Sequence, residues 1–164
     1  MRRVITGLGA DGRSTVLSDG PPPVAFHAGS PAGVAQVGGR WTGDELGPGE
    51  AIVHELWALE DRPARLHNDP TVAIARPAYE PAPAATKWIL TEMGPALEAP
   101  MHETPTVDYA VIVAGQVELG LEDAAVVLHA GDTVLVNGVR HSWRAGPSGC
   151  VIATVLVGLR AEAR

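Results

Sequence analysis

The sequence has a single cysteine, Cys150, and no run of basic residues longer than Arg2-Arg3. One cysteine cannot form an intrachain disulfide or a thiolate cage for a metal, which excludes a disulfide-rich secreted scaffold and a structural zinc finger. It favours a reducing, cytoplasmic setting. Twelve lysines and arginines against 19 aspartates and glutamates leave a formal net charge of -7. Because no basic patch is available to neutralise phosphates, we expect no nucleic-acid partner.

Long hydrophobic runs are also missing. No apolar stretch approaches the roughly 20 residues of a membrane-spanning helix. Arg2-Arg3 is followed by VITG rather than by the apolar core of a signal peptide. We therefore expect a soluble, unprocessed protein with no membrane partner. The chain has 164 residues, of which 46% are hydrophobic and only 19% charged, and this predicts one folded domain with a core of its own.

Glycine and proline punctuate the whole chain, with 19 glycines and 14 prolines. The stretches between them run only four to eight residues and are rich in valine, isoleucine and threonine, a composition typical of strands. The sequence therefore predicts an all-β protein.

Residues 2–6 and 13–18 are predicted to pair as an N-terminal hairpin, with Asp11-Gly12 in its turn. The letters between them, GLGADG, match the G-x-G-x-x-G motif of dinucleotide-binding enzymes. That motif functions only when its last glycine opens a helix whose N-terminus holds the pyrophosphate. Here a β-branched run, RSTVLS, follows. We interpret the glycines as a hairpin turn and expect neither a nicotinamide nor a flavin cofactor.

The rest of the first half has a weaker pattern. Residues 21–49 are predicted to be loop with one short strand at 34–37, and residues 51–59 fit either a strand or a short helix. Residues 61–85 form a long irregular segment, of a length that usually covers something in a compact domain. Together with the hairpin, we expect residues 1–85 to form an extension that packs on the second half.

From residue 86 onward the strand pattern is regular. Turn residues such as Gly94-Pro95, Gly115 and Asn137-Gly138 recur at roughly the 8–12-residue spacing of β-sandwiches and barrels. We predict a rolled antiparallel barrel core over 86–164, within one structural domain overall. Its expected strands are 86–93, 106–114, 116–122, 125–129, 133–136, 141–144 and 150–159.

Three residues capable of binding a metal, His102, Asp108 and His141, lie at the ends of successive predicted strands. An even number of residues separates His102 from Asp108, so both face the same side of an extended chain. If that side is interior, two imidazoles and one carboxylate converge and leave coordination positions open. This arrangement suits Fe(II) and is tolerated by Mn, Ni or Zn. The alternative is two hydrogen-bonded core histidines and a turn-capping aspartate.

The same segment resembles the two motifs of the cupin superfamily, G-x5-H-x-H-x3,4-E-x6-G and G-x5-P-x-G-x2-H-x3-N. The matching residues are, for the first motif, His102, Thr104, Asp108 and Gly115, and, for the second, Gly131, Val136, Gly138 and His141. A closer similarity is to small single-domain cupins with H-x-T-x-T-x-D-Y in the first motif, present here as HETPTVDY. The resemblance implies a double-stranded β-helix, the jelly-roll barrel of cupins, with the N-terminal β-hairpin as an extension.

The chain departs from the superfamily pattern at its ligand positions. Thr104 replaces the second histidine, Asp108 is one methylene shorter than glutamate, and Ala145 stands where the second motif has asparagine. A site of three histidines and one glutamate therefore cannot form as usual. His54 could supply a missing ligand if its strand lines the cavity; the alternative is a packed histidine on an apolar strand.

The candidate substrate-pocket residues are Thr104, Thr106, Tyr109 and Trp143. Trp143 shares a face with His141 and could form an apolar wall, although a barrel interior is both core and pocket. Tyr109 points away from that interior in a regular strand unless a bulge turns it inward. The alternation of Arg140 and Arg144 with the His141 side predicts that both arginines face solvent.

These features favour a metal-dependent enzyme that acts on a small organic molecule. The first expectation is a lyase step, decarboxylation or dehydration, on an aromatic, polyketide-like or carboxylate substrate. Glu103 and Asp108 are the candidate catalytic residues, because such a step needs a positioned acid or base. The alternatives are an Fe(II) dioxygenase of the cupin type and a non-catalytic protein that binds a small ligand. We also expect a homodimer, since the hairpin has exposed strand edges that a second copy could pair with.

Overall fold

The computed structural model describes residues 2–22, 24–30, 33–36, 46–59 and 80–160. Every regular element in these ranges is a strand, which confirms the all-β prediction. No helix in the described ranges has the length and apolar character needed to cross a membrane. The strands are β1 (Arg3–Leu8), β2 (Ser14–Gly20), β3 (Val24–Ser30), β4 (Gly33–Gln36), β5 (Ala51–Leu59), β6 (Thr86–Met93), β7 (Glu98–His102), β8 (Thr106–Gly120), β9 (Ala125–His129), β10 (Thr133–Asn137) and β11 (His141–Gly158).

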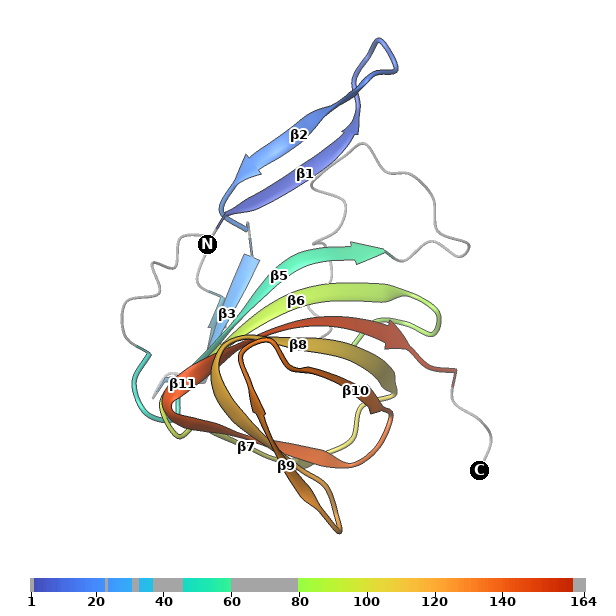
Figure 1. The fold of residues 1–164 in the computed structure, drawn as a ribbon. Coiled ribbons are helices and arrows are strands. Elements are labelled where there is room, and N and C mark those ends of the chain that lie inside the picture. The colour runs from blue at the N-terminus through green and yellow to red at the C-terminus, as the bar shows by residue number, and fades with distance from the viewer. Residues whose placement is uncertain (1, 23, 31–32, 37–45, 60–79, 161–164) are drawn as a thin grey trace.

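Nine of the strands form one sheet in the order β10-β8-β11-β6-β5-β3-β4, with β7 paired to β11 and β9 paired to β8. All strand pairs in this sheet are antiparallel. The sheet curls so that β7, β9 and β10 lie below the arch of β6, β8 and β11 (Figure 1). The predicted rolled barrel is therefore confirmed. Strands β3, β4 and β5 come from residues 1–85 but extend the same sheet.

The core of the barrel is formed by the inward-pointing side chains of its central strands. Along parts of β8 and β11 buried residues alternate with more exposed ones, and the buried ones include Ala110, Ile112 and Ile152. Side chains that point inward from neighbouring strands meet in one hydrophobic cluster, which also contains Val117. Full burial of a side chain of this size contributes about 1.5–3 kcal/mol, so this cluster holds the sheet in its rolled form.

Two long strands replace four predicted ones. Gly115 was expected to end a strand, and Gly146-Pro147 to separate two others, but β8 and β11 run through these positions with shifts in register. Gly115 has φ +73°, and a Cβ there would lie 2.2 Å from the carbonyl oxygen of Gly149. The glycines therefore allow the backbones of β8 and β11 to approach each other closely within one continuous strand pair, and they do not reverse the chain.

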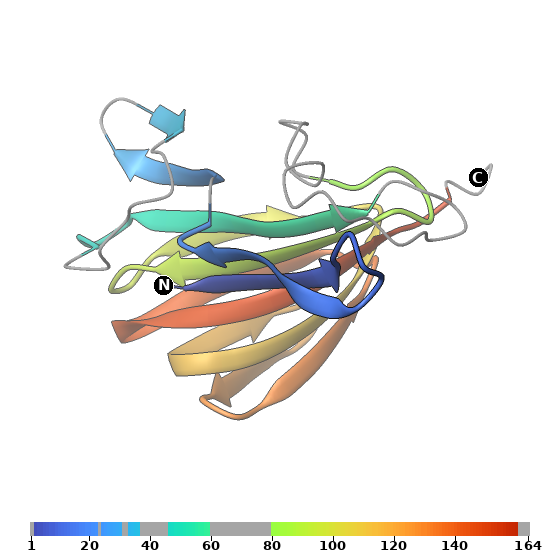
Figure 2. The same cartoon turned by 90° about the horizontal axis from the view of Figure 1, so that it is seen from above.

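The N-terminal hairpin is a separate two-stranded sheet, as predicted. Its turn is closed by backbone hydrogen bonds from Gly9 to Arg13 and from Gly12 to Gly9, and Gly12 has φ +75°. The G-x-G-x-x-G letters thus cover the end of β1 and the hairpin turn that leads into strand β2. The hairpin lies over the outer side of the large sheet (Figure 2), where Arg3 donates a buried hydrogen bond to the carbonyl oxygen of Leu56.

Two segments differ from the sequence prediction, and a third, which was ambiguous, is resolved. Residues 24–30 were expected to be loop and form β3, residues 98–102 were not assigned and form β7, and the ambiguous segment 51–59 is a strand. The short strand expected at 34–37 is β4, although residue 37 lies outside the described residues. Most of the irregular segment 61–85, residues 61–79, also lies outside them.

Candidate functional site

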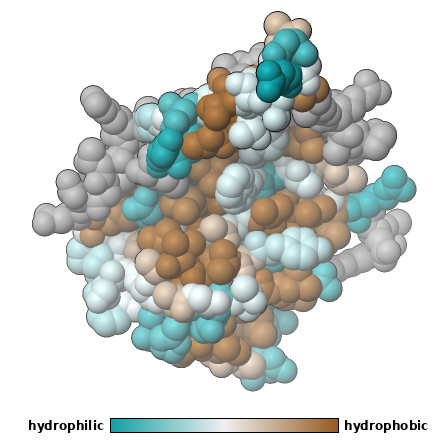
Figure 3. All heavy atoms as spheres, turned by 45° about the horizontal axis from the view of Figure 1, so that its top comes forward, coloured by the Kyte–Doolittle hydropathy of each residue, from teal (hydrophilic) through white to brown (hydrophobic). Residues whose placement is uncertain are grey.

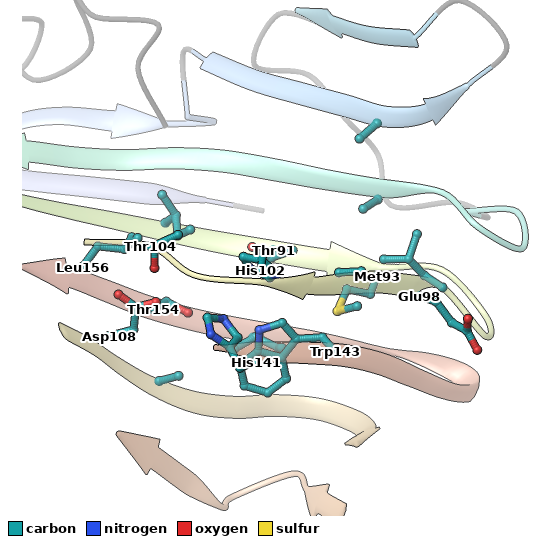
Figure 4. A pocket seen from close by; sticks show the side chains of 17 residues that line it. Thr91, Met93, Glu98, His102, Thr104, Asp108, His141, Trp143, Thr154 and Leu156 are labelled. Carbon is teal, nitrogen blue, oxygen red and sulfur yellow. The ribbon is translucent and has the colours of Figure 1, made fainter. Parts of the chain in front are cut away.

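A cavity of ≈ 280 Å³ occupies the barrel interior. Its walls come from β6, β7, β8 and β11, with Ala28 of β3 and Ala51 of β5 at one side. Figure 4 shows side chains from these strands pointing into one space, with His102 and His141 near its middle. Most of the lining is apolar. In such surroundings a polar side chain has little water around it, so a hydrogen bond to a bound molecule is stronger than it would be in water.

His102 and His141 face each other across the β7–β11 pair, where they are direct register partners. Their ring centroids are 4.3 Å apart. Nδ1 of His102 is 2.7 Å from the carbonyl oxygen of Pro100, and Nδ1 of His141 is 2.8 Å from that of Val139. A carbonyl oxygen only accepts, so each Nδ1 must carry the hydrogen. In the neutral rings each Nε2 then keeps a free lone pair, the form of histidine that binds metals.

Asp108 projects into the same cavity from β8. Its Oδ1 is buried and has no hydrogen-bond partner among the described residues. Burial raises the pKa of Asp108 above its ordinary value, and a hydrogen bond with Thr106 and the nearby rings of His141 and His102 oppose this rise. An unpaired buried carboxyl oxygen is costly, so this oxygen marks a place where a ligand or an ion would be stabilised.

Thr104 and Trp143 complete the part of the wall that the sequence identified. Thr104 is buried, lines the cavity and shares a hydrogen bond of 2.9 Å with Thr106. The indole of Trp143 stands edge-on to the ring of His141, with centroids 5.8 Å apart. Trp143 therefore forms an apolar wall beside the histidines, whereas Thr106 is fully buried behind Thr104 and is not a lining residue.

Two other candidates lie elsewhere. Glu103 is exposed and does not line the cavity. Tyr109 follows the regular alternation of β8 and is 58% exposed on the outer face, so no bulge turns it inward. Neither residue is placed to touch a molecule in the cavity. The physical reason is the same for both, because each directly follows in sequence a residue whose side chain points inward.

The remaining charged candidates are outside the barrel interior. Arg140 pairs with Glu122 and Arg144 with Glu118 on the exterior, in agreement with the prediction that both face solvent. His54 does not line the cavity; its Nε2 is 2.9 Å from Oε1 of Glu92. His54 is therefore a packed, hydrogen-bonded histidine rather than a further ligand.

Sequence reasoning missed several lining residues. Thr91, Met93 and Thr154 point inward from β6 and β11, whereas Glu98 of β7 is exposed and lies at the edge of the cavity, with its carboxylate directed away from the histidines (Figure 4). Alternation in 86–93 and 150–159 could have placed the first three on an interior face.

Behind the cavity wall, the sulfur of Cys150 lies 3.7 Å from the sulfur of Met93, and burial raises the pKa of the Cys150 thiol to about 11. Such a thiol is a packed group and not a nucleophile.

The donor chemistry of His102, His141 and Asp108 fits a divalent transition metal. Each histidine has its Nδ1 hydrogen bonded to a backbone carbonyl, which is how protein scaffolds orient metal-binding imidazoles, and the carboxyl oxygen is unpaired. The side chains nevertheless stand apart. Among the described residues no three histidine, cysteine, aspartate or glutamate side chains are gathered closely enough to hold an ion.

Comparison with known proteins agrees with the fold. No protein-family profile matches the chain. Over 97 residues it is 28% identical to a cupin-domain-containing oxidoreductase, srdD, of Neurospora crassa, covering 57% of this chain and 50% of that protein. It is 26% identical over 97 residues to phomopsin biosynthesis cluster protein C' of Diaporthe leptostromiformis, covering 56% and 51%. The chain thus spans about half the length of the curated relatives it matches.

Among solved structures, the cupin domain of Schizosaccharomyces pombe Cnp3 superposes with a TM-score of 0.50 at 11% sequence identity. The match covers 96% of this chain and 87% of that one. This similarity concerns the fold alone. The rolled antiparallel barrel with its interior cavity is that of a cupin. The sequence match to a cupin-domain-containing protein agrees with that fold.

Proposed function

We propose that this chain is a metal-dependent enzyme that acts on a small, largely apolar organic molecule held in the barrel cavity. One observation carries the proposal. Two histidines with free Nε2 lone pairs and a carboxyl group with an unpaired oxygen face one mainly apolar cavity of ≈ 280 Å³. A purely structural interior has no need to leave these three groups unsatisfied together.

His102, His141 and Asp108 are the residues that would hold the metal, which we expect to be Fe, Mn, Ni or Zn, and their side chains would have to come closer together than they stand in this structure. A bound metal of this kind supplies a Lewis acid and, in the case of iron, a redox centre. Trp143, Ile89 and Ile152 line the same cavity and would shield a bound molecule from water. The hydroxyl groups of the lining threonines can orient a polar group of the substrate by hydrogen bonding.

Two observations bear on the reaction. A lyase step requires a positioned acid or base, and Glu103, the residue expected to serve, is exposed and outside the cavity. Two histidines and one carboxylate leave coordination positions for both dioxygen and substrate, and the Neurospora crassa relative is named as an oxidoreductase. We therefore favour a dioxygenase reaction, in which both atoms of dioxygen enter the organic product and no further reductant is consumed.

Metal binding is tested first. Protein loaded anaerobically with Fe(II) is desalted and analysed for bound iron, as wild type and as His102→Ala and His141→Ala. We expect each substitution to lower the iron content severalfold while the protein stays folded. His129→Ala is the matched control, because His129 is an exposed histidine outside the cavity. Wild-type iron content in both cavity variants would refute the assignment of the ligands.

The reaction class is tested with nitric oxide as a stand-in for dioxygen. The Fe(II) protein should give the high-spin iron–nitrosyl signal in electron paramagnetic resonance, and oxygen uptake should follow with some member of a panel of small aromatic and polyketide-like acids. Carbon dioxide release without oxygen uptake would show a lyase instead. Iron-free wild-type protein whose melting temperature is unaffected by chelators would show a protein that only binds a small ligand.

A further inference from the structure

The barrel cavity is longer than it is wide. Ile89, Thr91 and Met93 are successive inward residues of β6, and all three line the cavity. The cavity therefore follows this strand for about 14 Å, at ~3.4 Å per residue. Figure 4 shows Asp108 at one end, Met93 at the other, and the two cavity histidines between them. A volume of ≈ 280 Å³ over that length leaves a mean cross-section of about 20 Å². A space of this width suits a single carbon chain better than a fused ring system.

At the Met93 end the cavity extends sideways to two more strands. Ala28 of β3 is the register partner of Ala51 of β5, and Ala51 is the partner of Met93. All three residues line the cavity, and Ala51 is only 7% exposed. We call the part of the cavity lined by these three residues the alanine arm. Two of its three side chains are single methyl groups, so the space in front of them stays open.

Larger side chains would fill the alanine arm, as they do elsewhere in the barrel. Inward positions of the central strands hold Ile112 and Ile152, which are almost completely buried. An unfilled apolar space lowers stability, because its lining loses van der Waals contacts. Such a space stays free of water and binds apolar molecules, which restore those contacts. The alanine arm is therefore suited to an apolar part of a bound molecule.

The charges around the cavity favour an uncharged occupant of the alanine arm. Among the described residues, no lysine or arginine lines the cavity. Glu98 lies at the Met93 end in Figure 4 and would repel a negative charge there. The groups that can bind a polar atom, the two histidine Nε2 atoms and Oδ1 of Asp108, lie away from this end. Since burial of an unpaired charge is costly, the lining matches a molecule that is polar at one end and apolar along the rest.

We propose that the cavity holds a molecule with a polar head and an unbranched, uncharged hydrocarbon tail, and that the tail lies in the alanine arm. The head lies at His102, His141 and Asp108. At ~30 Å³ for each non-hydrogen atom, the volume of one molecule in liquid water, ≈ 280 Å³ holds about nine such atoms. The tail is then about six to eight carbon atoms long. This inference names the substrate class of the proposed function and rests on that function for the reaction, but binding of the tail itself requires no metal.

The test measures the binding of straight-chain alcohols to the full chain by calorimetry, with a chelator present. Each buried methylene should tighten binding about fourfold, so the dissociation constant should fall about 250-fold from 1-butanol to 1-octanol. 1-Decanol exceeds the volume of the cavity and should gain nothing further. Because the chelator removes metal, this result does not depend on the iron measurements. A failed ligand assignment and a failed tail assignment are therefore distinguishable.

Substitutions in the alanine arm should shorten the chain that the cavity accepts. Ala51→Leu adds three carbon atoms to the arm. It should leave the affinity for 1-butanol unchanged and weaken that for 1-octanol about 60-fold, the factor for three methylenes. Ala28→Leu changes a less buried position and should act in the same direction. Circular dichroism checks the fold of both variants, and Ala28→Leu decides the matter if Ala51→Leu does not fold.

Ala153→Leu is the matched control, because Ala153 lies on β11 but does not line the cavity. Hydrophobic side chains also gather on the outer surface below the hairpin (Figure 3), and outward residues such as Trp88 and Val155 are exposed. The control variant should bind every alcohol as wild type does. Wild-type affinity that does not rise with chain length would overturn the proposal. So would 1-octanol affinity that neither arm variant lowers, or that Ala153→Leu lowers as much as they do.

Discussion

The pair formed by Lys87 and Glu55 allows a quantitative test of how the barrel interior tolerates charge. The two side chains come from neighbouring strands, β6 and β5, and form an ion pair in which each is only 5% exposed. Lys87 is a register partner of Leu156, which in turn is the partner of Asp108. The pair therefore lies on the strands that form the wall of the cavity, and it is removed from water.

Removing one member of a buried pair leaves the other charge without compensation, which costs about 3–5 kcal/mol. The whole chain is expected to be stable by about 5–15 kcal/mol, so Lys87→Met alone should remove a large part of its stability. Replacing both residues by apolar ones of similar volume, Lys87→Met with Glu55→Leu, removes the desolvation penalty as well. We expect this double variant to lie within about 1 kcal/mol of wild type.

The assay is equilibrium unfolding in urea followed by tryptophan fluorescence, with wild type, both single variants and the double variant forming a cycle. The matched control is Arg144→Met, which breaks an ion pair of 2.7 Å with Glu118 on the exterior. Exposed pairs contribute little, so the urea midpoint of this control should not change. Equal midpoints for Lys87→Met and Arg144→Met would refute the reasoning, as would a double variant no more stable than the single ones.

Three further predictions concern other parts of the molecule. Thr104→His places an imidazole on the cavity wall and should tighten binding of Zn(II) by adding a donor to the site, measured by calorimetry; unchanged affinity would mean that residue 104 does not reach the metal. The hydrogen bond from His54 lowers the pKa of Glu92, so the stabilisation it provides is complete above the pKa of the unfolded chain, near 4.3, and is lost as the pH falls through the lower folded value. Thermal unfolding should accordingly show a smaller acid loss for Glu92→Gln than for wild type, and parallel curves would contradict this. Gly115→Ala combines φ +73° with a Cβ contact of 2.2 Å to backbone and should destabilise by more than about 2 kcal/mol, whereas Gly131→Ala, at φ +96° with open space around it, should cost only about 1 kcal/mol; similar urea midpoints would argue against a tight crossing at Gly115.

Much of the barrel could be predicted because alternation and turn residues agree along its second half. The bounds of β6 and β9 match the predicted segments. The errors have specific causes. Strand β7 has the sequence EAPMH, whose proline and irregular polarity conceal a strand that is defined by its pairing with β11. Glycines inside β8 and β11 permit bulges, which look like chain breaks when no partner strand is known.

The site could be predicted as far as motif spacing, and the alternation of side chains along a strand, determine which side chains point into the barrel. His102, Asp108, Thr104, Trp143 and His141 all line the cavity. Simple alternation also placed Tyr109 outside, against its selection as a pocket residue. The part of the wall formed by Thr91 and Thr154 could not be assembled from sequence, because only the pairing of β6 with β11 brings these distant residues together.

The pairing of β7 has a consequence for the local stability of the site. This five-residue strand is hydrogen-bonded to β11 and, in the described part of the chain, to no other strand. Fraying of β7 would carry His102 away from His141 while Asp108 stays on the central strand β8. Such local openings need far less free energy than global unfolding. Amide hydrogens of β7 should therefore exchange faster than those of β8, and a ligand that bridges the two histidines should slow exchange in β7 first.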